Sequence, residues 1–180
     1  MVEEIKKYNL LYTDPPWKQT KGGRRKVRPV QTKQLDYKTL SMDTIFNIHE
    51  KFCIGNCEST HTCFMWAIDK YLPEIEFNMK RLGYRLHARI IWNKKNGIAP
   101  AFTVRYSHEY LLWFYKGKFQ PIHKEQRGKW TTVIEERSTK HSRKPEVAYN
   151  FIESIYPNTL KFEMYARNNR KGWDACGDEI

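Results

Sequence analysis

Short apolar runs alternate with segments of helical periodicity along this chain, and no other feature of the sequence constrains its fold as tightly. The predicted strands cover residues 8–13, 62–68, 86–92, 109–115, 160–167 and 173–180, and the predicted helices cover residues 43–51, 71–82 and 145–156. In the last helix, Val147, Phe151 and Ile155 fall on one stripe behind Pro145, which is expected at the first helical position. Such alternation predicts an α/β fold with helices on both faces of a sheet. A length of 180 residues favours one domain, here residues 1–180.

Three long connections interrupt this predicted scaffold, at residues 18–38, 93–107 and 116–141. Connections of this length are uncommon in compact domains and are usually functional or mobile. In α/β sheets, ligands bind beyond the carboxyl ends of the strands. Asp14 and Arg167 both fall at such ends, so we expect the functional site there.

The tetrapeptide Asp14-Pro15-Pro16-Trp17 directly follows the first predicted strand. The carboxylate of Asp14 and a backbone carbonyl of the proline pair can both accept hydrogen bonds from an exocyclic amine. The prolines stiffen the turn and donate no N–H, and Trp17 offers a flat face on which a heterocycle can stack. An aspartate before a proline is also a common helix start. The full tetrapeptide after a strand favours the amine-binding interpretation.

The chain carries 32 Lys and Arg against 20 Asp and Glu, a formal net charge of +12. A charge of this size predicts a polyanionic partner such as nucleic acid, because each neutralised phosphate releases counterions. Part of the charge is clustered just after the tetrapeptide, in Lys18, Lys21, Arg24, Arg25, Lys26 and Arg28. We interpret these residues as a loop that grips phosphates; a generically basic, solvated surface is the alternative.

Potential zinc ligands gather at His49, Cys53, Cys57, His61 and Cys63. Their spacing contains no Cys-x2-Cys pair, and Cys63 lies within an apolar run, where a buried thiol is normal. The spacing therefore favours buried thiols and no metal; a zinc site is the alternative.

No apolar run approaches the roughly 20 residues of a membrane span. The first residues also lack the apolar core of a signal peptide. We therefore expect a soluble, cytoplasmic protein without a membrane partner.

Seven motifs follow one another over nearly the whole chain: DPPW (14–17), DYKTLSM (36–42), IIWNK (90–94), HEYLL (108–112), HSRKPE (141–146), FEMYAR (162–167) and GWDACGDE (172–179). Together they resemble the MT-A70 family of S-adenosylmethionine-dependent adenine-N6 methyltransferases, in a compact form of bacterial or phage type. The resemblance implies a Rossmann-like class I methyltransferase fold, with a mixed, mostly parallel sheet flanked by helices. It also implies a permuted motif order, with the catalytic motif first and the cofactor half last.

The resemblance assigns roles to individual residues. Asp14, Pro15, Pro16 and Trp17 would hold the target adenine, with Asp14 also facing the methyl donor, S-adenosylmethionine. The amino-acid and ribose portions of the donor would be held by Lys144, Glu163, Arg167, Asn168 and Asn169, and its adenine and ribose would lie near Asp178 and Glu179. Lys94, Asn96 and Glu109 would line the acceptor side.

Two of these residues can also be interpreted from their sequence positions. Lys144 precedes a predicted helix, where a cation and free backbone N–H groups favour a carboxylate; a surface lysine beside a helix cap is the alternative. Glu163 lies in an apolar strand, which is costly without a partner. Binding a ribose or an amino group is one explanation, and pairing with Arg167 is the other.

The function that follows is methyl transfer to N6 of adenine in nucleic acid, with DNA favoured over RNA and the target base flipped out or single-stranded. We expect Asp14 to be ionised, because the donor's sulfonium and the basic surroundings favour the anion. Transfer to N4 of cytosine is an alternative, and so is a catalytically weak nucleic-acid-binding subunit. The partners expected besides nucleic acid are a second copy or a related subunit, as a homodimer or heterodimer.

Overall fold

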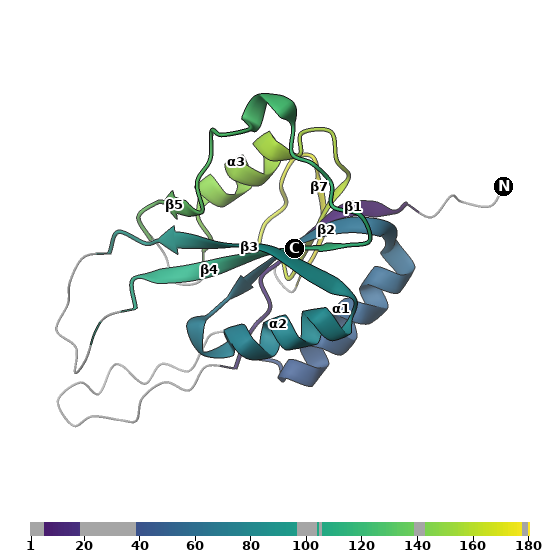
Figure 1. The fold of residues 1–180 in the computed structure, drawn as a ribbon. Coiled ribbons are helices and arrows are strands. Elements are labelled where there is room, and N and C mark those ends of the chain that lie inside the picture. The colour runs from purple at the N-terminus through teal and green to yellow at the C-terminus, as the bar shows by residue number, and fades with distance from the viewer. Residues whose placement is uncertain (1–5, 19–38, 97–103, 105, 139–142, 178–179) are drawn as a thin grey trace, which may run out of the picture.

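A computed structural model describes residues 6–18, 39–96, 104, 106–138, 143–177 and 180. At its centre is a seven-stranded sheet in the order β5-β3-β4-β2-β1-β6-β7 (Figure 1). The strands are β1 (Tyr8–Thr13), β2 (Cys57–Ala67), β3 (Tyr84–Asn93), β4 (His108–Lys116), β5 (Val133–Glu135), β6 (Lys161–Met164) and β7 (Trp173–Cys176). The helices are α1 (Met42–Asn56), α2 (Leu72–Arg81) and α3 (Glu146–Ile155), with 3-10 turns at Asp69–Tyr71 and Lys124–Gln126. No helix in the described part of the chain is long and apolar enough to cross a membrane.

One strand runs against all the others. β1 pairs in parallel with β2 and β6, β6 with β7, and β3 with β5, whereas β4 is antiparallel to both of its neighbours, β2 and β3. The carboxyl ends of the other six strands therefore share one edge of the sheet with the first residues of β4. This edge is where ligands of α/β sheets bind.

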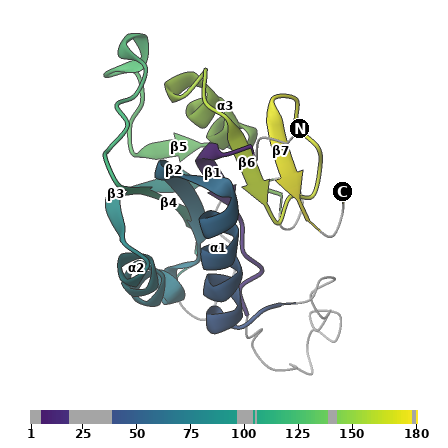
Figure 2. The same cartoon turned by 90° about the vertical axis from the view of Figure 1, so that its right-hand side faces the viewer.

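Helices cover both faces of the sheet, as the alternating pattern predicted. α1 and α2 lie on one face and α3 lies on the other (Figures 1 and 2). Side chains of β1 alternate between two buried clusters, because successive residues of a strand point to opposite faces. Leu11 belongs to the cluster with α1 and α2, and Leu10 and Tyr12 belong to the cluster with α3.

The structure differs from the predicted elements mainly at their ends. α1 continues to Asn56 and leads directly into β2, which begins before the apolar run that predicted it. β6 ends at Met164, because the next residue, Tyr165, has a φ of +62° that no strand continues. Pro145 is the N-cap residue of α3 and not its first helical residue. The short edge strand β5 was missed, since three residues are too few to show a periodicity.

Candidate active site

Asp14, Glu109 and Lys144 come from three separate segments and meet at the carboxyl-end edge of the sheet. Asp14 follows the last residue of β1, and β1 ends beside the end of β6. Glu109 is the second residue of the reversed strand β4 and lies opposite Trp92, near the end of β3. Lys144 precedes the N-cap of α3. The reversal of β4 is therefore what brings a glutamate to the same edge as the aspartate.

These side chains form a row of alternating charge, Asp14–Lys144–Glu109–Lys94. Lys144 Nζ lies 3.1 Å from Asp14 Oδ1 and 2.8 Å from Glu109 Oε2, and Lys94 Nζ lies 2.5 Å from Glu109 Oε1. The four side chains are only 14% to 21% exposed. Lys144 Nζ also lies 5.0 Å from the centre of the Trp66 ring, whose face attracts a cation. Ion pairs this far from solvent are screened much less than surface pairs.

Burial and neighbouring charges set the protonation of this row. Burial raises the pKa of Asp14 and the charge of Glu109 raises it further, although Lys144 and Arg167 act in the opposite direction. The pKa of Asp14 thus moves up, because burial disfavours the anion. Burial lowers the pKa of Lys144, but Asp14 and Glu109 outweigh this effect and raise it to about 12. For Glu109, the two lysines outweigh burial and lower its pKa.

The turn after β1 is held by its own backbone. Trp17 N donates to Pro15 O at 2.8 Å, and Leu40 N donates to Pro16 O at 3.0 Å. Trp17 and Leu40 form an isolated parallel bridge, so the chain returns beside the turn just before α1. Each proline carbonyl keeps a second lone pair for another donor.

The position of Trp17 corrects the prediction of an open stacking face. Its side chain is 4% exposed, and its indole N–H donates to Trp66 O at 2.9 Å. The ring packs against Tyr71 and Phe46, with centroids 6.0 and 6.4 Å away. An indole is large enough to anchor a loop in the core. In this structure Trp17 therefore anchors the turn to the core of the protein.

Glu163 lies on β6 with 6% of its surface exposed. It accepts a hydrogen bond of 2.8 Å from the hydroxyl of Tyr149, a residue of α3. Burial raises the pKa of Glu163 to about 7; the Tyr149 bond acts against this rise, and the charge of Asp14 adds to it. A tyrosine partner was not among the explanations that the sequence suggested for this buried acid.

The raised pKa predicts a specific pH dependence of stability. Between pH 4.5 and 7 the folded protein binds more protons at Glu163 than the unfolded chain does. The free energy of unfolding therefore decreases as the pH rises through this range, and the contribution of the neutral carboxyl is lost once the pH passes 7. A pKa of about 7 in place of 4.5 corresponds to on the order of 3 kcal/mol. Glutamine stays neutral at every pH. We therefore expect the free energy of unfolding of Glu163→Gln, relative to that of wild type, to rise by about this much as the pH increases from 4.5 to 7.

Urea unfolding at a series of pH values measures this difference. Glu50→Gln changes an exposed glutamate of α1 and serves as the matched control, expected to follow the wild-type curve within about 0.5 kcal/mol. Parallel curves for wild type and Glu163→Gln would show that Glu163 titrates alike in the folded and unfolded chains.

The N-terminus of α3 corrects a second expectation. The backbone N–H groups of Glu146 and Val147 donate to the carboxylate of Glu136, at 3.0 and 2.8 Å. This acid satisfies donors that we had expected to be open to a ligand carboxylate. Lys144, next to that helix end, is instead directed to Asp14 and Glu109.

The remaining residues singled out in the sequence are spread more widely. Asn168 and Asn169 are exposed after β6, and Lys18 is exposed after the turn. Asn96 follows β3, and its buried Oδ1 has no hydrogen-bond partner in the described part of the chain. The residues outside the described ranges are Lys21, Arg24, Arg25, Lys26, Arg28, Asp178 and Glu179. Trp66, Glu136 and Tyr149 were missed, because their contacts depend on pairing between distant segments.

The sheet order with its one reversed strand, and the polar site at the carboxyl ends of the other strands, define a Rossmann-like methyltransferase fold. The chain belongs to the MT-A70 family, whose model matches residues 8–179.

This chain is similar to methyltransferases of two kinds. The chain is 25% identical over 191 residues to the type II methyltransferase M.MunI of a Mycoplasma species, covering 97% of this chain and 78% of that protein. It is 26% identical over 190 residues to the human N(6)-adenosine-methyltransferase catalytic subunit METTL3, covering 99% of this chain but 29% of that protein. For an Arabidopsis thaliana N(6)-adenosine-methyltransferase MT-A70-like protein the identity is 23%, and the chain spans 24% of its length.

Proposed function

We propose that this protein transfers a methyl group from S-adenosylmethionine to the N6 amine of an adenine in DNA. The observation that carries the proposal is the position of Asp14. This carboxylate lies where β1 and β6 end side by side, and Lys144 balances its charge. The proline turn that directly follows Asp14 supplies carbonyl acceptors. Family membership supports the same reaction.

Asp14 acts on the acceptor amine. An aromatic amine is a poor nucleophile because its lone pair is delocalised into the ring. Lys144 contacts Oδ1 of Asp14, and the second carboxylate oxygen accepts one amine hydrogen while a proline carbonyl accepts the other. Two acceptors of this kind localise the lone pair on nitrogen and fix its direction of attack. As the nitrogen bonds to the methyl carbon, the carbon–sulfur bond of the donor would break with its electron pair left on sulfur, and the surplus proton of the amine would pass to water. Alignment of the reacting atoms then supplies most of the acceleration.

The ends of β1 and β6 fit a cationic donor. The charge of Asp14 contributes to the raised pKa of Glu163, so a cation held by these carboxylates would remove an unfavourable interaction. When bound, S-adenosylmethionine supplies a methyl group activated by its sulfonium. We assign Glu163 and Arg167 to the amino-acid and ribose portions of the donor, with Asn168 and Asn169 beside them.

On the acceptor side we assign Lys94, Asn96 and Glu109 to the surroundings of the target base. Asn96 Oδ1 is a buried acceptor without a partner among the described residues, and a hydrogen-bond donor of the substrate would satisfy it. A base reaches such a site only when it leaves the stack, so the substrate is a flipped or single-stranded base. The net charge of +12 favours binding to its phosphates.

The choice of DNA rests on the relatives. The chain spans most of the type II methyltransferase M.MunI but under a third of METTL3. We therefore take M.MunI, of which the chain matches 78%, as the better guide to the substrate. The name of METTL3 calls it a catalytic subunit, and we extend this to the proposal that the present chain works as a dimer, with a second copy or with a related subunit.

The test is incubation with donor labelled in its methyl group and with DNA or RNA of matched sequence, followed by digestion to nucleosides and mass analysis. We expect label in N6-methyladenine from DNA. Label from RNA alone would reverse the choice of polymer, and label in N4-methylcytosine would reverse the choice of base. A protein that binds both polymers but shows neither transfer nor heat of donor binding in calorimetry would be a binding subunit, and the proposal would fail.

A further inference from the structure

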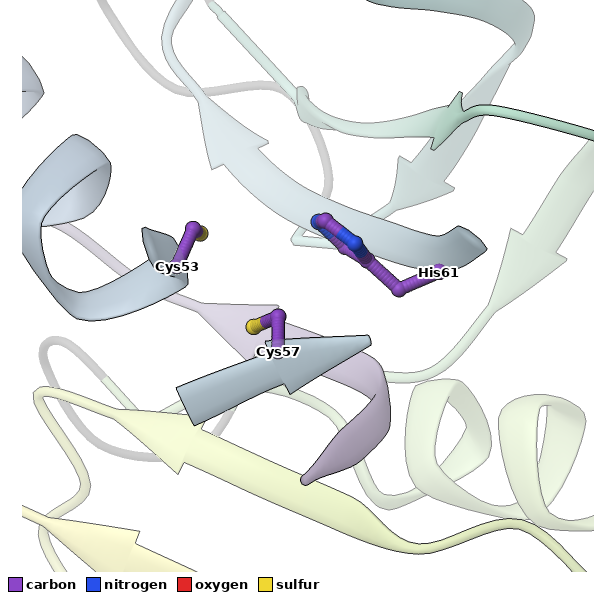
Figure 3. Close-up of side chains that lie close together, drawn as sticks. All are labelled: Cys53, Cys57 and His61. Carbon is purple, nitrogen blue, oxygen red and sulfur yellow. The ribbon is translucent and has the colours of Figure 1, made fainter. Parts of the chain in front are cut away.

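Two cysteines and a histidine form a buried cluster at the junction of α1 and β2. Cys53 lies in the last turn of α1, Cys57 begins β2, and His61 follows along β2 with its ring directed toward the cysteines (Figure 3). The Sγ atoms and a ring nitrogen lie within 4.8 Å of one another. Exposed fractions are 8%, 6% and 2%, so the cluster is closed to bulk water.

The fold brings the three side chains together although their spacing in sequence does not match a common zinc motif. Cys57 N donates to Cys53 O where α1 ends, which places the second cysteine one helical turn from the first. Residues four apart in a regular strand are separated by about 13 Å. Here β2 is irregular: Tyr8 and Leu10 of β1 pair with Cys57 and Thr62, so additional residues of β2 fold back between them. This bulge returns His61 to the start of its own strand.

The imidazole of His61 is oriented as in a metal ligand. Nδ1 lies 2.6 Å from the backbone oxygen of Glu58, and since a carbonyl only accepts, Nδ1 carries the proton. The lone pair of Nε2 therefore faces the cluster, where it now accepts from the Tyr84 hydroxyl at 2.5 Å. A ring N–H donated to a backbone carbonyl is the usual support of a metal-ligating histidine.

Two more polar side chains complete the surroundings. The hydroxyl oxygen of Tyr84 lies 3.2 Å from Cys53 Sγ and 3.3 Å from His49 Nε2. His49 is one helical turn before Cys53 and 2% exposed, and its buried Nδ1 has no partner within the described part of the chain. A polar group left unsatisfied in the interior is costly. On the side of the cluster that faces Tyr84, the hydroxyl oxygen of Tyr84 and, beyond it, Nε2 of His49 are further polar atoms.

We propose that Cys53 Sγ, Cys57 Sγ and His61 Nε2 bind a zinc ion, with the fourth coordination position toward Tyr84 and His49. Two thiols and an imidazole are the ligands that zinc prefers, and each thiol loses its proton on binding. Zinc–sulfur and zinc–nitrogen bonds of about 2.3 and 2.0 Å place tetrahedral ligand atoms about 3.5 to 3.8 Å apart. Shifts on the order of 1 Å convert the present arrangement into that geometry.

The site is structural and separate from the proposed chemistry. Cys57 is paired with Tyr8 at the start of β1, whereas Asp14 follows the end of β1, so the two sites lie at opposite edges of the sheet. A zinc ion here would join the end of α1 to β2 and hold the bulge of β2. The proposal does not depend on the methyltransferase activity.

The test is the metal content of protein expressed with added zinc and purified without chelator. We expect about one zinc per chain in wild type and a loss of most of it in Cys53→Ser and Cys57→Ser. Cys63→Ser and Cys176→Ser are matched controls that keep the metal, the first buried in β2 outside the cluster and the second exposed on β7. Because the cluster variants can fail to fold, wild-type protein is also stripped with a chelator and reloaded with zinc or cobalt.

Reloading should release about two protons per ion, produce a thiolate-to-cobalt absorption band, and raise the Tm by roughly 5 °C or more. Wild-type protein without zinc, and with an unchanged Tm on zinc addition, would leave only a hydrogen-bonded network around Tyr84 and overturn the proposal. A Cys53–Cys57 disulfide found by mass spectrometry in freshly purified protein would overturn it as well.

Discussion

Asp14→Ala is expected to lower the rate of methyl transfer by on the order of 10³-fold or more, with the donor still bound. The reason is that the carboxylate orients the amine and localises its lone pair, an interaction that matters most in the transition state. Lys144 remains paired with Glu109 at 2.8 Å in this variant, so the loss of Asp14 does not leave an isolated buried cation. The fold should therefore persist.

Single-turnover transfer from labelled donor to DNA measures this rate, and calorimetry measures donor affinity. Asp174→Asn is the matched control, because Asp174 lies on β7 and is bonded to Tyr8, at the start of β1 and away from the site. It should leave the rate within a few-fold of wild type. An Asp14→Ala protein as active as wild type would remove the aspartate from the mechanism.

The parts of the fold that were predicted correctly depend on local periodicity. β1 was predicted residue for residue, and α2 and α3 within one or two residues at each end, because their apolar residues repeat along a single segment. The reversal of β4 left no comparable local signal, since strand direction depends on which segments pair. The same holds for the contact between Lys144 and Glu109, 35 residues apart.

The cysteine cluster shows what spacing in the sequence does not capture. Spacing argued against zinc, because standard motifs place two ligands on one tight turn. In this chain a helix end followed by a bulged strand brings Cys53, Cys57 and His61 together at a different spacing, and the zinc measurement decides between the two predictions.

Trp17 is the opposite case. The sequence showed that the motif contains this tryptophan, but it could not show which way the side chain points. The packing against Phe46 and Tyr71 shows that the indole points into the core.

Lys144→Met should be the most destabilising single change at the site, at about 3 to 5 kcal/mol. Lys144 Nζ lies within 3.1 Å of two carboxylates, and its side chain is 14% exposed. Without the cation, Asp14 and Glu109 repel one another in a partly buried site, and their pKa values rise because the main opposing charge is gone. Much of the loss therefore comes from the acids left behind.

Glu109→Gln removes one of the two acids, so Lys144→Met with Glu109→Gln should be more stable than Lys144→Met alone, although the two residues are in direct contact. Urea unfolding at neutral pH measures all three variants, and Lys80→Met, an exposed lysine of α2, should change stability by no more than about 0.5 kcal/mol. If the double variant were less stable than Lys144→Met, the loss would come from missing contacts of the lysine stem, and the alternating charges would not be what holds this edge of the sheet together.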